Sequence, residues 1–361
     1  MRTFLLASLL LASCNSSRLA SAPPGSYLVV LDKADATLSM IEPNSAHLRD
    51  MAPTGTGPHE GAASPDGSLV VVCDYGDQTP GHTLTVFDPF ARHVTATIDL
   101  APHTRPHGIA FLDQRSTVLV TSETSQALLV VDLRSRKVTR VIPSGAELTH
   151  MLALTPDHSR VFTANVGSGS VSAIDLASGK LLEVIQTGAQ PEAIAVSPDG
   201  NEVWVGHNKD NKIVVIDAHT LEKKIEFACA DMPIRITFVP NGQLALVSCA
   251  KSSELAVIDA AGRREWKRIP MPAKLAQPMP SQAVSVPGAA EPPDSMPVGV
   301  LCDPDGRYAY VACTGADQVA VIDLATLELK GVIPTGKEPD GMAWLYNRRG
   351  YNNPDADIVP H

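Results

Sequence analysis

The chain has 361 residues, of which 44% are hydrophobic, 19% charged and only 4% aromatic, so a large core would be built mainly from Val, Ala, Leu and Ile. Acidic residues outnumber basic ones by 39 to 29, giving a formal net charge of −10. This balance disfavours a nucleic-acid binder with a general basic surface, because phosphate contacts need clustered Lys and Arg. Beyond the extreme N-terminus no apolar run is long enough to predict a membrane-spanning helix.

The first residues are typical of an export signal. Arg2 provides a positive charge, and residues 4–11 form an apolar segment that is too short for a transmembrane helix. The segment ends in Leu-Ala-Ser-Cys at residues 11–14, which resembles the lipobox of bacterial lipoproteins. An ordinary signal peptide, cut after a small residue with Cys14 incidental, is the alternative.

The lipobox resemblance implies that residues 1–13 are removed and that Cys14 is acylated. The acyl chains would then be the only attachment of the protein to a membrane, on its extracytoplasmic side. Asn15 follows the cysteine, where an Asp would favour inner-membrane retention in that pattern, so an outer-membrane or periplasmic location is predicted. Residues 14–26 are rich in Ser, Ala and Pro and indicate a flexible tether.

A repeated unit then runs through the rest of the chain. It consists of a short apolar segment, a Pro-Asp-Gly-like turn, an apolar strand, and a further strand that ends in Ile-Asp or Val-Asp. The first segments begin at Pro58, Pro106, Thr149, Pro191, Pro233, Pro297 and Pro339, with spacings of 48, 43, 42, 42, 64 and 42 residues. Four short strands per unit and a period near 42 residues are typical of a propeller blade.

The number of blades follows from the two ends of the repeat region. Residues 27–51 provide three strands without an innermost one, and residues 339–345 provide an innermost strand without the other three. Pairing them completes one mixed blade, and six full blades lie between. The sequence therefore predicts an all-β, seven-bladed β-propeller over residues 27–345, sealed by its termini so that strand edges are covered, followed by a tail at 346–361.

Two of the repeats carry a resemblance to a known family. Residues 191–222, PEAIAVSPDGNEVWVGHNKDNKIVVIDAHTLE, and residues 297–328, PVGVLCDPDGRYAYVACTGADQVAVIDLATLE, resemble the YVTN repeat of bacterial and archaeal surface-layer and periplasmic propellers. The YncE-like proteins and the seven-bladed lactonase-type propellers share this pattern. The resemblance implies the propeller fold, but such propellers include binding modules, lactonases and lyases, so it does not fix a function.

The direction of the innermost strands indicates where a site would lie. All of them start on one face, at the mouth of the central channel, and their second residues form one column. In blade order, this column consists of His59, His107, His150, Glu192, Ile234, Val298 and, on the mixed blade, Asp340. Three histidines and a glutamate thus occupy four consecutive blades, and we expect them to converge.

Converging imidazoles with a carboxylate are typical ligands of a divalent transition metal. His59, His107, His150 and Glu192 are therefore the predicted ligands of one Zn²⁺, Mn²⁺, Fe²⁺ or Cu²⁺ ion. Iron-dependent carotenoid oxygenases and manganese-dependent pectate-fragment lyases, both propellers, have a similar site architecture without sequence similarity. The alternative is a polar channel lining in which the histidines are merely hydrogen-bonded.

Two groups of neighbours extend the candidate site. Arg235, one residue past the column, is predicted to hold a carboxylate or phosphate ligand, with a salt bridge to Glu192 or Asp231 as the alternative. The ends of the second strands form a polar tier on the same face, made of Asp74, Ser122, Asn165, His207, Cys249 and Cys313. His207 and Asn165 are the candidate ligand-binding members, and capping of the turn into the third strand is the alternative for most of this tier.

The remaining cysteines and one insertion complete the set of unusual features. No Cys-x-x-Cys spacing occurs, and the five cysteines after Cys14 are interpreted as small buried strand residues. Cys249 and Cys313 hold equivalent positions on adjacent blades, expected to lie too far apart for a disulfide. The spacing of 64 residues places an insertion at 269–296, which is either a flap over the channel or an inert surface loop.

Two classes of function follow from these observations. The first is an exported, lipid-anchored, monomeric propeller that binds a small ligand, a metal or another extracytoplasmic protein at the channel mouth. The second is a metal-dependent lactonase, lyase or oxygenase, with Glu192, Asp340 or a channel histidine as base and Arg235 assisting. No nucleophile elbow, P-loop, dinucleotide-binding glycine motif or His-Glu-x-x-His motif is present to support a serine hydrolase, a nucleotide-dependent enzyme or a metalloprotease.

Overall fold

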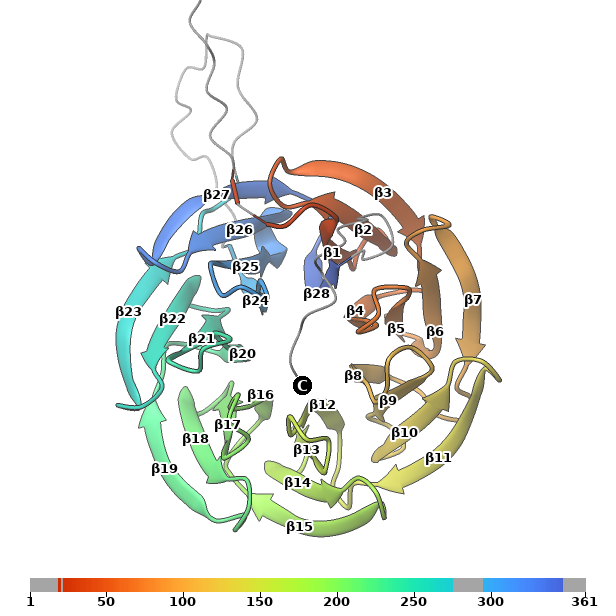
Figure 1. The fold of residues 1–361 in the computed structure, drawn as a ribbon. Helices are drawn as coiled ribbons and strands as arrows, with labels where there is room; N and C mark the ends of the chain where they lie inside the picture. The colour runs from red at the N-terminus through yellow and green to blue at the C-terminus, as the bar shows by residue number, and fades with distance from the viewer. Residues whose placement is uncertain (1–18, 21, 275–294, 347–361) are drawn as a thin grey trace, which may run out of the picture.

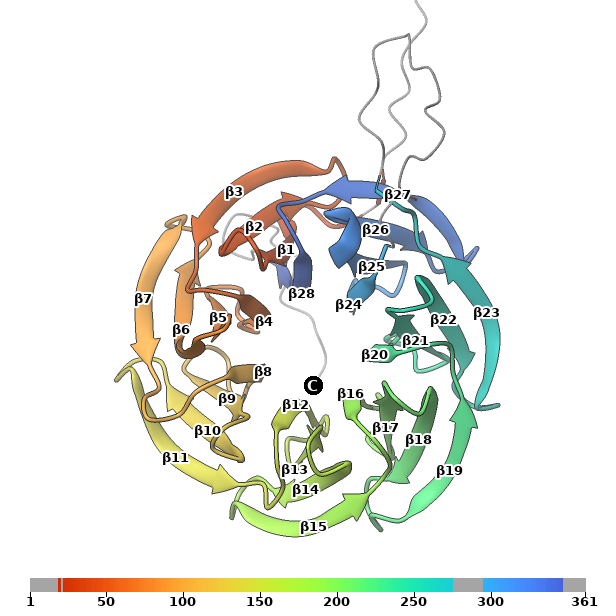
Figure 2. The same ribbon diagram turned by 180° about the vertical axis from the view of Figure 1, so that it is seen from behind.

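Seven four-stranded antiparallel sheets form a closed ring in the computed structural model of this protein, which describes residues 19–20, 22–274 and 295–346 (Figure 1). The innermost strands surround the axis and the outermost strands form the rim, as the view from behind also shows (Figure 2). The predicted all-β, seven-bladed propeller is confirmed. Within the described ranges no helix is long and apolar enough to cross a membrane.

Each blade is one sheet, whose strands follow one another from the axis outward. Blade 1 consists of β28 (Pro339–Tyr346), β1 (Ser26–Asp32), β2 (Thr37–Glu42) and β3 (His47–Pro53). Blade 2 consists of β4 (Pro58–Ala63), β5 (Val70–Gly76), β6 (Pro80–Asp88) and β7 (His93–Asp99). Blade 3 consists of β8 (Pro106–Phe111), β9 (Thr117–Ser122), β10 (Ala127–Asp132) and β11 (Lys137–Pro143).

The other four blades repeat this order. Blade 4 consists of β12 (Thr149–Leu154), β13 (Arg160–Asn165), β14 (Ser170–Asp175) and β15 (Lys180–Gln186). Blade 5 consists of β16 (Pro191–Val196), β17 (Glu202–His207), β18 (Lys212–Asp217) and β19 (Lys223–Ala228). Blade 6 consists of β20 (Pro233–Phe238), β21 (Leu244–Cys249), β22 (Glu254–Asp259) and β23 (Arg264–Pro270). Blade 7 consists of β24 (Pro297–Cys302), β25 (Tyr308–Cys313), β26 (Gln318–Asp323) and β27 (Glu328–Pro334), with a short 3-10 turn, η1 (Thr314–Ala316).

The ring closes through blade 1, as the sequence predicts. Strand β28, from the C-terminal end of the repeat region, pairs antiparallel with β1, so that Ala343 lies opposite Val29 and Met342 opposite Val30. This pairing covers the inner edge of β1, which would otherwise expose unpaired backbone groups.

The core lies between neighbouring blades. Small and branched apolar residues on the two faces of each sheet pack against the next sheet, which explains why so few aromatic residues suffice. One aromatic cluster joins blades 5 and 6, where the fully buried Trp204 makes edge-to-face contacts with Phe227 and Phe238.

A bulge near the start of every innermost strand positions the residues at the axis. Pairing with the second strand shifts just after the first residue, for example between Pro191 and Ala193 and between Pro106 and Ile109. The one or two residues in between are released from the ladder, and their side chains are re-aimed. The residue before each of these strands has a left-handed φ of 47° to 63°, and six of the seven are not glycine, so the sharp entry is imposed by the blade geometry.

Several predicted segments lie outside the described residues. These are the signal peptide at 1–13, the lipidation site Cys14 and the tail beyond residue 346. The tether at 14–26 and the insertion at 269–296 are described only in part.

Candidate functional site at the channel mouth

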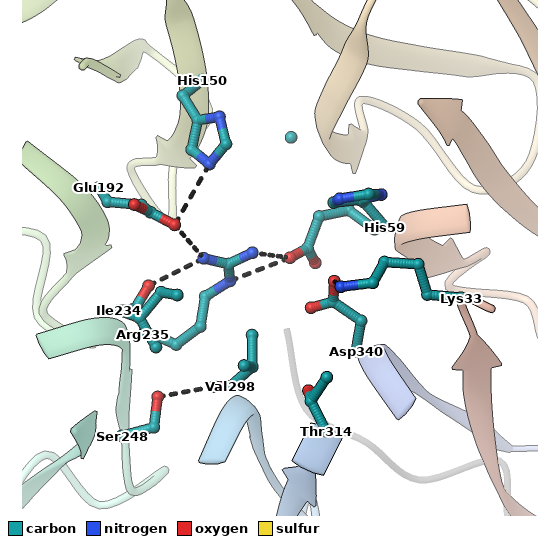
Figure 3. A network of polar contacts seen from close by, with 12 residues as sticks. Lys33, His59, His150, Glu192, Ile234, Arg235, Ser248, Val298, Thr314 and Asp340 are labelled. Atoms are coloured by element: carbon teal, nitrogen blue, oxygen red, sulfur yellow. Dashed lines mark hydrogen bonds and ion pairs between the residues drawn. The ribbon is translucent and has the colours of Figure 1, made fainter. Parts of the chain in front are cut away.

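The structure brings the predicted column residues together at the axial end where the innermost strands start, which we call the channel mouth. The imidazole rings of His59 and His107 lie 5.3 Å apart between centroids, and those of His107 and His150 lie 3.7 Å apart. Glu192 lies next to His150, with 3.5 Å between Oε1 and Nε2. Figure 3 shows His150 and Glu192 on one side of Arg235, and His59 and Asp340 on the other.

Polar contacts link blade to blade around the mouth. The Tyr75 hydroxyl on blade 2 donates a hydrogen bond of 2.8 Å to Glu123 Oε2 on blade 3. The other oxygen of Glu123 accepts a hydrogen bond from Nδ1 of His150 on blade 4. Glu192, on blade 5, accepts a further hydrogen bond from the Asn208 side chain.

The series then returns across the axis to blade 2. Arg235, on blade 6, lies 3.6 Å from Glu192 through Nη1 and donates from Nε and Nη2 to Glu60 Oε1, at 3.0 and 2.6 Å. Arg235 and Glu60 are separated by 175 residues in the chain. We call the six residues of this series the polar belt: Tyr75, Glu123, His150, Glu192, Arg235 and Glu60.

The protonation states of the belt follow from its contacts. Burial alone would lower the pKa of His150, but its hydrogen bonds to Glu123 and Glu192 and their charges outweigh burial and raise the pKa to about 9. Burial would raise the pKa of Glu192, and the hydrogen bond and charge of His150 reverse this, so the Glu192 pKa is lowered. His150 is therefore an imidazolium held between two carboxylates at neutral pH.

Arg235 is committed to protein partners. Only 7% of the residue is exposed, and Nη1 also donates a hydrogen bond of 2.8 Å to the Ile234 carbonyl. Burial opposes its charge, but Glu60, Asp340 and Glu192 raise the pKa of Arg235 further above its usual range. Of the two alternative partners that the sequence suggested, Glu192 is found, whereas Asp231 instead accepts from Asn211.

Two histidines at the mouth are neutral. Burial is the main cause that lowers the pKa of His59 and holds the pKa of His107 well below its usual value, and the charge of His150 adds to the effect on His107. His59 Nδ1 lies 2.8 Å from the Gly57 carbonyl, so it is the donor nitrogen and Nε2 keeps its lone pair. His107 is 1% exposed, and its Nδ1 has no hydrogen-bond partner among the described residues.

Asp340 lies beside His59, on blade 1 (Figure 3). Its Oδ2 is 3.6 Å from Nζ of Lys33, and the other oxygen, Oδ1, is buried without a hydrogen-bond partner in the described part of the chain. The strand can approach its neighbour because Gly341 follows, where a Cβ atom would lie 2.2 Å from the His59 carbonyl oxygen. Any larger residue at this position would push β28 away from β4.

Several members of the site are not among the residues that the sequence predicts. Tyr75, Glu123 and Asn208 each lie one residue after a second-strand position that the prediction used. Lys33 directly follows β1, the second strand of blade 1, whose end was not among the predicted positions. Glu60 and Arg235 share the third position of an innermost strand, which otherwise holds Gly, Ala or Met. Two opposite charges in a column of small and apolar residues are the sequence signal of a pair across the axis, and the prediction did not use it.

Two predicted ligand-binding residues are not part of the polar belt. The side-chain hydrogen bonds of Asn165 stay within blade 4, with Thr163, Ser170 and Ser172. His207 is fully buried at the end of β17, with its ring against Gly188, and burial lowers its pKa to about 4. Asn165, at the end of the second strand of blade 4, therefore points into its own blade and not toward the polar belt.

The predicted metal ligands are close together but are not arranged as a metal site. In the described ranges no group of three or more His, Cys, Asp or Glu side chains is placed to hold a metal ion. His150 explains this, because it is protonated, because both of its nitrogens face carboxylates, and because its tilted ring lies against His107 with 3.7 Å between centroids. The divalent metal is therefore not shown and stays a prediction.

Comparisons with known proteins support the fold. Residues 103–279 match the family model described as the cytochrome D1 heme domain, over somewhat less than half of the chain. A chain of Kuenenia stuttgartiensis hydrazine synthase is similar, with a TM-score of 0.65 and 18% identity, covering 79% of this chain and 89% of that one. A functionally unknown protein from Desulfotomaculum acetoxidans DSM 771 gives a TM-score of 0.70 at 14% identity, covering 89% of this chain and 99% of that one. No curated protein matches the chain.

The family match raises the question of a haem. It makes a bound cofactor possible for this fold, and the matched residues include His107, His150 and Arg235. A haem on the axis at the channel mouth would, however, have to separate Arg235 from Glu60, whose 2.6 Å contact crosses from blade 6 to blade 2. The residues present do not fit a haem at this place while the polar belt is intact.

Proposed function

We propose that the protein binds a small polar ligand at the channel mouth through His107 and Asp340. The observation that supports this is a pair of buried polar atoms, His107 Nδ1 and Asp340 Oδ1, with no partner in the described part of the chain. Leaving such an atom unsatisfied costs about 1–3 kcal/mol, so each of these atoms favours a bound partner. A ligand that bonds to both atoms removes this cost.

The chemistry of the two atoms restricts the ligand. An ionised Asp340 can only accept, so the ligand must carry a hydrogen-bond donor. His107 is neutral at physiological pH, because its pKa is held well below the usual value, and it offers one N–H and one lone pair. The polar belt beside them holds His150 in a fixed orientation against His107 through the Glu123 hydrogen bond.

A metal-dependent enzyme is the second candidate, favoured by the closeness of three imidazoles to Glu192. Binding one Zn²⁺, Mn²⁺, Fe²⁺ or Cu²⁺ ion to all three histidines would require His150 to lose the proton on Nε2, while Nδ1 could stay hydrogen-bonded to Glu123. Glu192 or Asp340 would then act as the base in a lactonase, lyase or oxygenase reaction.

Two measurements on protein purified without a histidine tag separate these candidates. Native mass spectrometry should show a bound small molecule that is lost in His107→Ala and in Asp340→Asn, and retained in the control His93→Ala on the outer strand β7. Elemental analysis of the same samples should show no stoichiometric transition metal. A stoichiometric metal would favour the enzyme, and a ligand that survives both substitutions would reject the proposed site.

We further propose that the protein acts outside the cytoplasm as a lipid-anchored monomer, and that it belongs to the YVTN-type propellers. The apolar segment at 4–11, Cys14 and the repeated units support this proposal. Its natural partner would be the small ligand or another extracytoplasmic protein that docks at the mouth.

A further inference from the structure

Two cysteines lie in contact outside the channel mouth. Cys229, just after the last strand of blade 5, and Cys249, at the end of β21 in blade 6, have their Sγ atoms 3.8 Å apart. Both thiols are free, and the residues are 8% and 0% exposed. The equivalent positions of Cys249 and Cys313 on adjacent blades did not predict this contact, because Cys229 lies after an outermost strand, across the blade boundary.

The two thiols are not equivalent. A hydrogen bond from the Cys249 thiol is the main cause that lowers the pKa of Cys229, whereas the same contact, together with burial, raises the pKa of Cys249. Cys229 is also the more exposed of the two. Cys229 is therefore the thiol that a small oxidant would meet first, and the one that more readily forms the attacking thiolate.

We propose that Cys229 and Cys249 form a reversible disulfide on reaction with an oxidised low-molecular-weight disulfide such as oxidised glutathione. The Cys229 thiolate attacks one sulfur of the oxidant, whose S–S bond breaks to release one thiolate. Cys249 then gives up its proton and attacks Cys229 Sγ in the mixed disulfide, which releases the second thiol. The cysteine pair loses two electrons and two protons, and the oxidant gains them.

The disulfide would lie next to the strand that carries Arg235. Cys249 is the ladder partner of Pro233, and the amide of Ala250 donates a hydrogen bond of 3.0 Å to the Met232 carbonyl. The cross-link would thus fasten the loop at 229–232, which leads into β20, to the neighbouring strand of the same blade. Oxidation would restrict the movement of the loop at 229–232, and it would add no group to the channel mouth.

Peptide mapping of the full chain tests the proposal directly. Trypsin cuts after Lys224, Arg235 and Lys251, so it separates the two cysteines into the peptides 225–235 and 236–251. After treatment with oxidised glutathione, we expect these two peptides to appear as one disulfide-linked species, with a loss of two titratable thiols. Dithiothreitol should restore both thiols.

Substitutions provide the controls. Cys249→Ser should stop the reaction at a stable mixed disulfide on Cys229, whereas Cys313→Ser should leave the linked peptides unchanged. If Cys249→Ser does not fold, the mapping of the unsubstituted chain decides alone. An unchanged thiol count, a link to any other cysteine, or a mixed disulfide that persists in the unsubstituted chain would overturn the proposal.

Discussion

Asp74 is a buried carboxyl whose ionisation should destabilise the fold. The residue is 2% exposed, and its oxygens accept hydrogen bonds from the Thr83 and Thr85 hydroxyls and the Gly55 amide. Burial outweighs these hydrogen bonds and raises its pKa from 3.8 to about 6. The folded chain therefore binds more protons than the unfolded chain between these two values, so stability falls as pH rises through them.

The magnitude follows from the same values. A rise in pKa from 3.8 to about 6, at about 1.36 kcal/mol per pH unit, corresponds to about 3 kcal/mol of unfolding free energy lost above pH 6. Asp74→Asn removes the charge, while its amide can still accept from Gly55 and donate to a threonine hydroxyl. Asn165 already does this at the equivalent position of blade 4, donating to Ser172 at 2.9 Å.

We therefore expect Asp74→Asn to raise the free energy of unfolding by up to about 3 kcal/mol at pH 8 and to change it little at pH 4. Urea unfolding followed by circular dichroism across this range measures both values. The reverse substitution, Asn165→Asp, should introduce the same pH dependence in blade 4 and destabilise the protein at pH 8. An Asp74→Asn protein that is less stable than the parent at pH 8 would refute this reasoning.

Three further predictions concern the polar belt and the anchor. Arg235→Met should lower the free energy of unfolding by about 3–5 kcal/mol, because it leaves buried carboxylates unpaired. Urea unfolding should show that adding Glu60→Gln recovers part of this loss, and strictly additive effects of the two substitutions would argue against a coupled pair. The stabilisation from His150 should be complete below about pH 6.5 and lost as pH rises through about 9. The free energy of unfolding of the parent should therefore fall by about 3 kcal/mol over this range, and that of His150→Gln should not. An equal dependence of unfolding free energy on pH in both proteins would contradict the raised pKa of His150. Cys14→Ser should abolish palmitate labelling and release the chain from the membrane fraction, and unchanged retention would show that another segment or a partner holds it there.

The repeated unit was sufficient to predict the fold and its closure from the sequence. Seven copies of one pattern specify seven blades, and the incomplete units at the two ends can be completed only by pairing with each other. The second-residue column was found for the same reason, because every blade turns its chain toward the axis with a bulge just after the first residue of its innermost strand. These features depend on local sequence patterns that recur from blade to blade, so they can be recognised from the sequence alone.

The other members of the site depend on details that recur less regularly. Along a strand, side chains alternate between faces, so a shift of one residue exchanges a group at the mouth for one inside the blade. This is why Tyr75 and Glu123, rather than Asp74 and Ser122, contribute to the polar belt. The width of the bulge also differs, since blade 2 releases both His59 and Glu60 from the ladder, whereas blade 4 releases His150 alone.

The polar belt also explains why a column of metal-ligating residue types forms no metal site among the described residues. A histidine binds a metal through a free lone pair. The protonation state of each ring depends on the groups that hydrogen-bond to it and on the charges nearby, and not on its position in the column. Glu123 and Glu192 keep His150 protonated, and the resulting positive charge helps to keep His107 neutral. Three residues of one type thus take different roles because their carboxylate neighbours differ: His150 is a charged structural group, whereas His59 and His107 are neutral rings that keep a nitrogen lone pair.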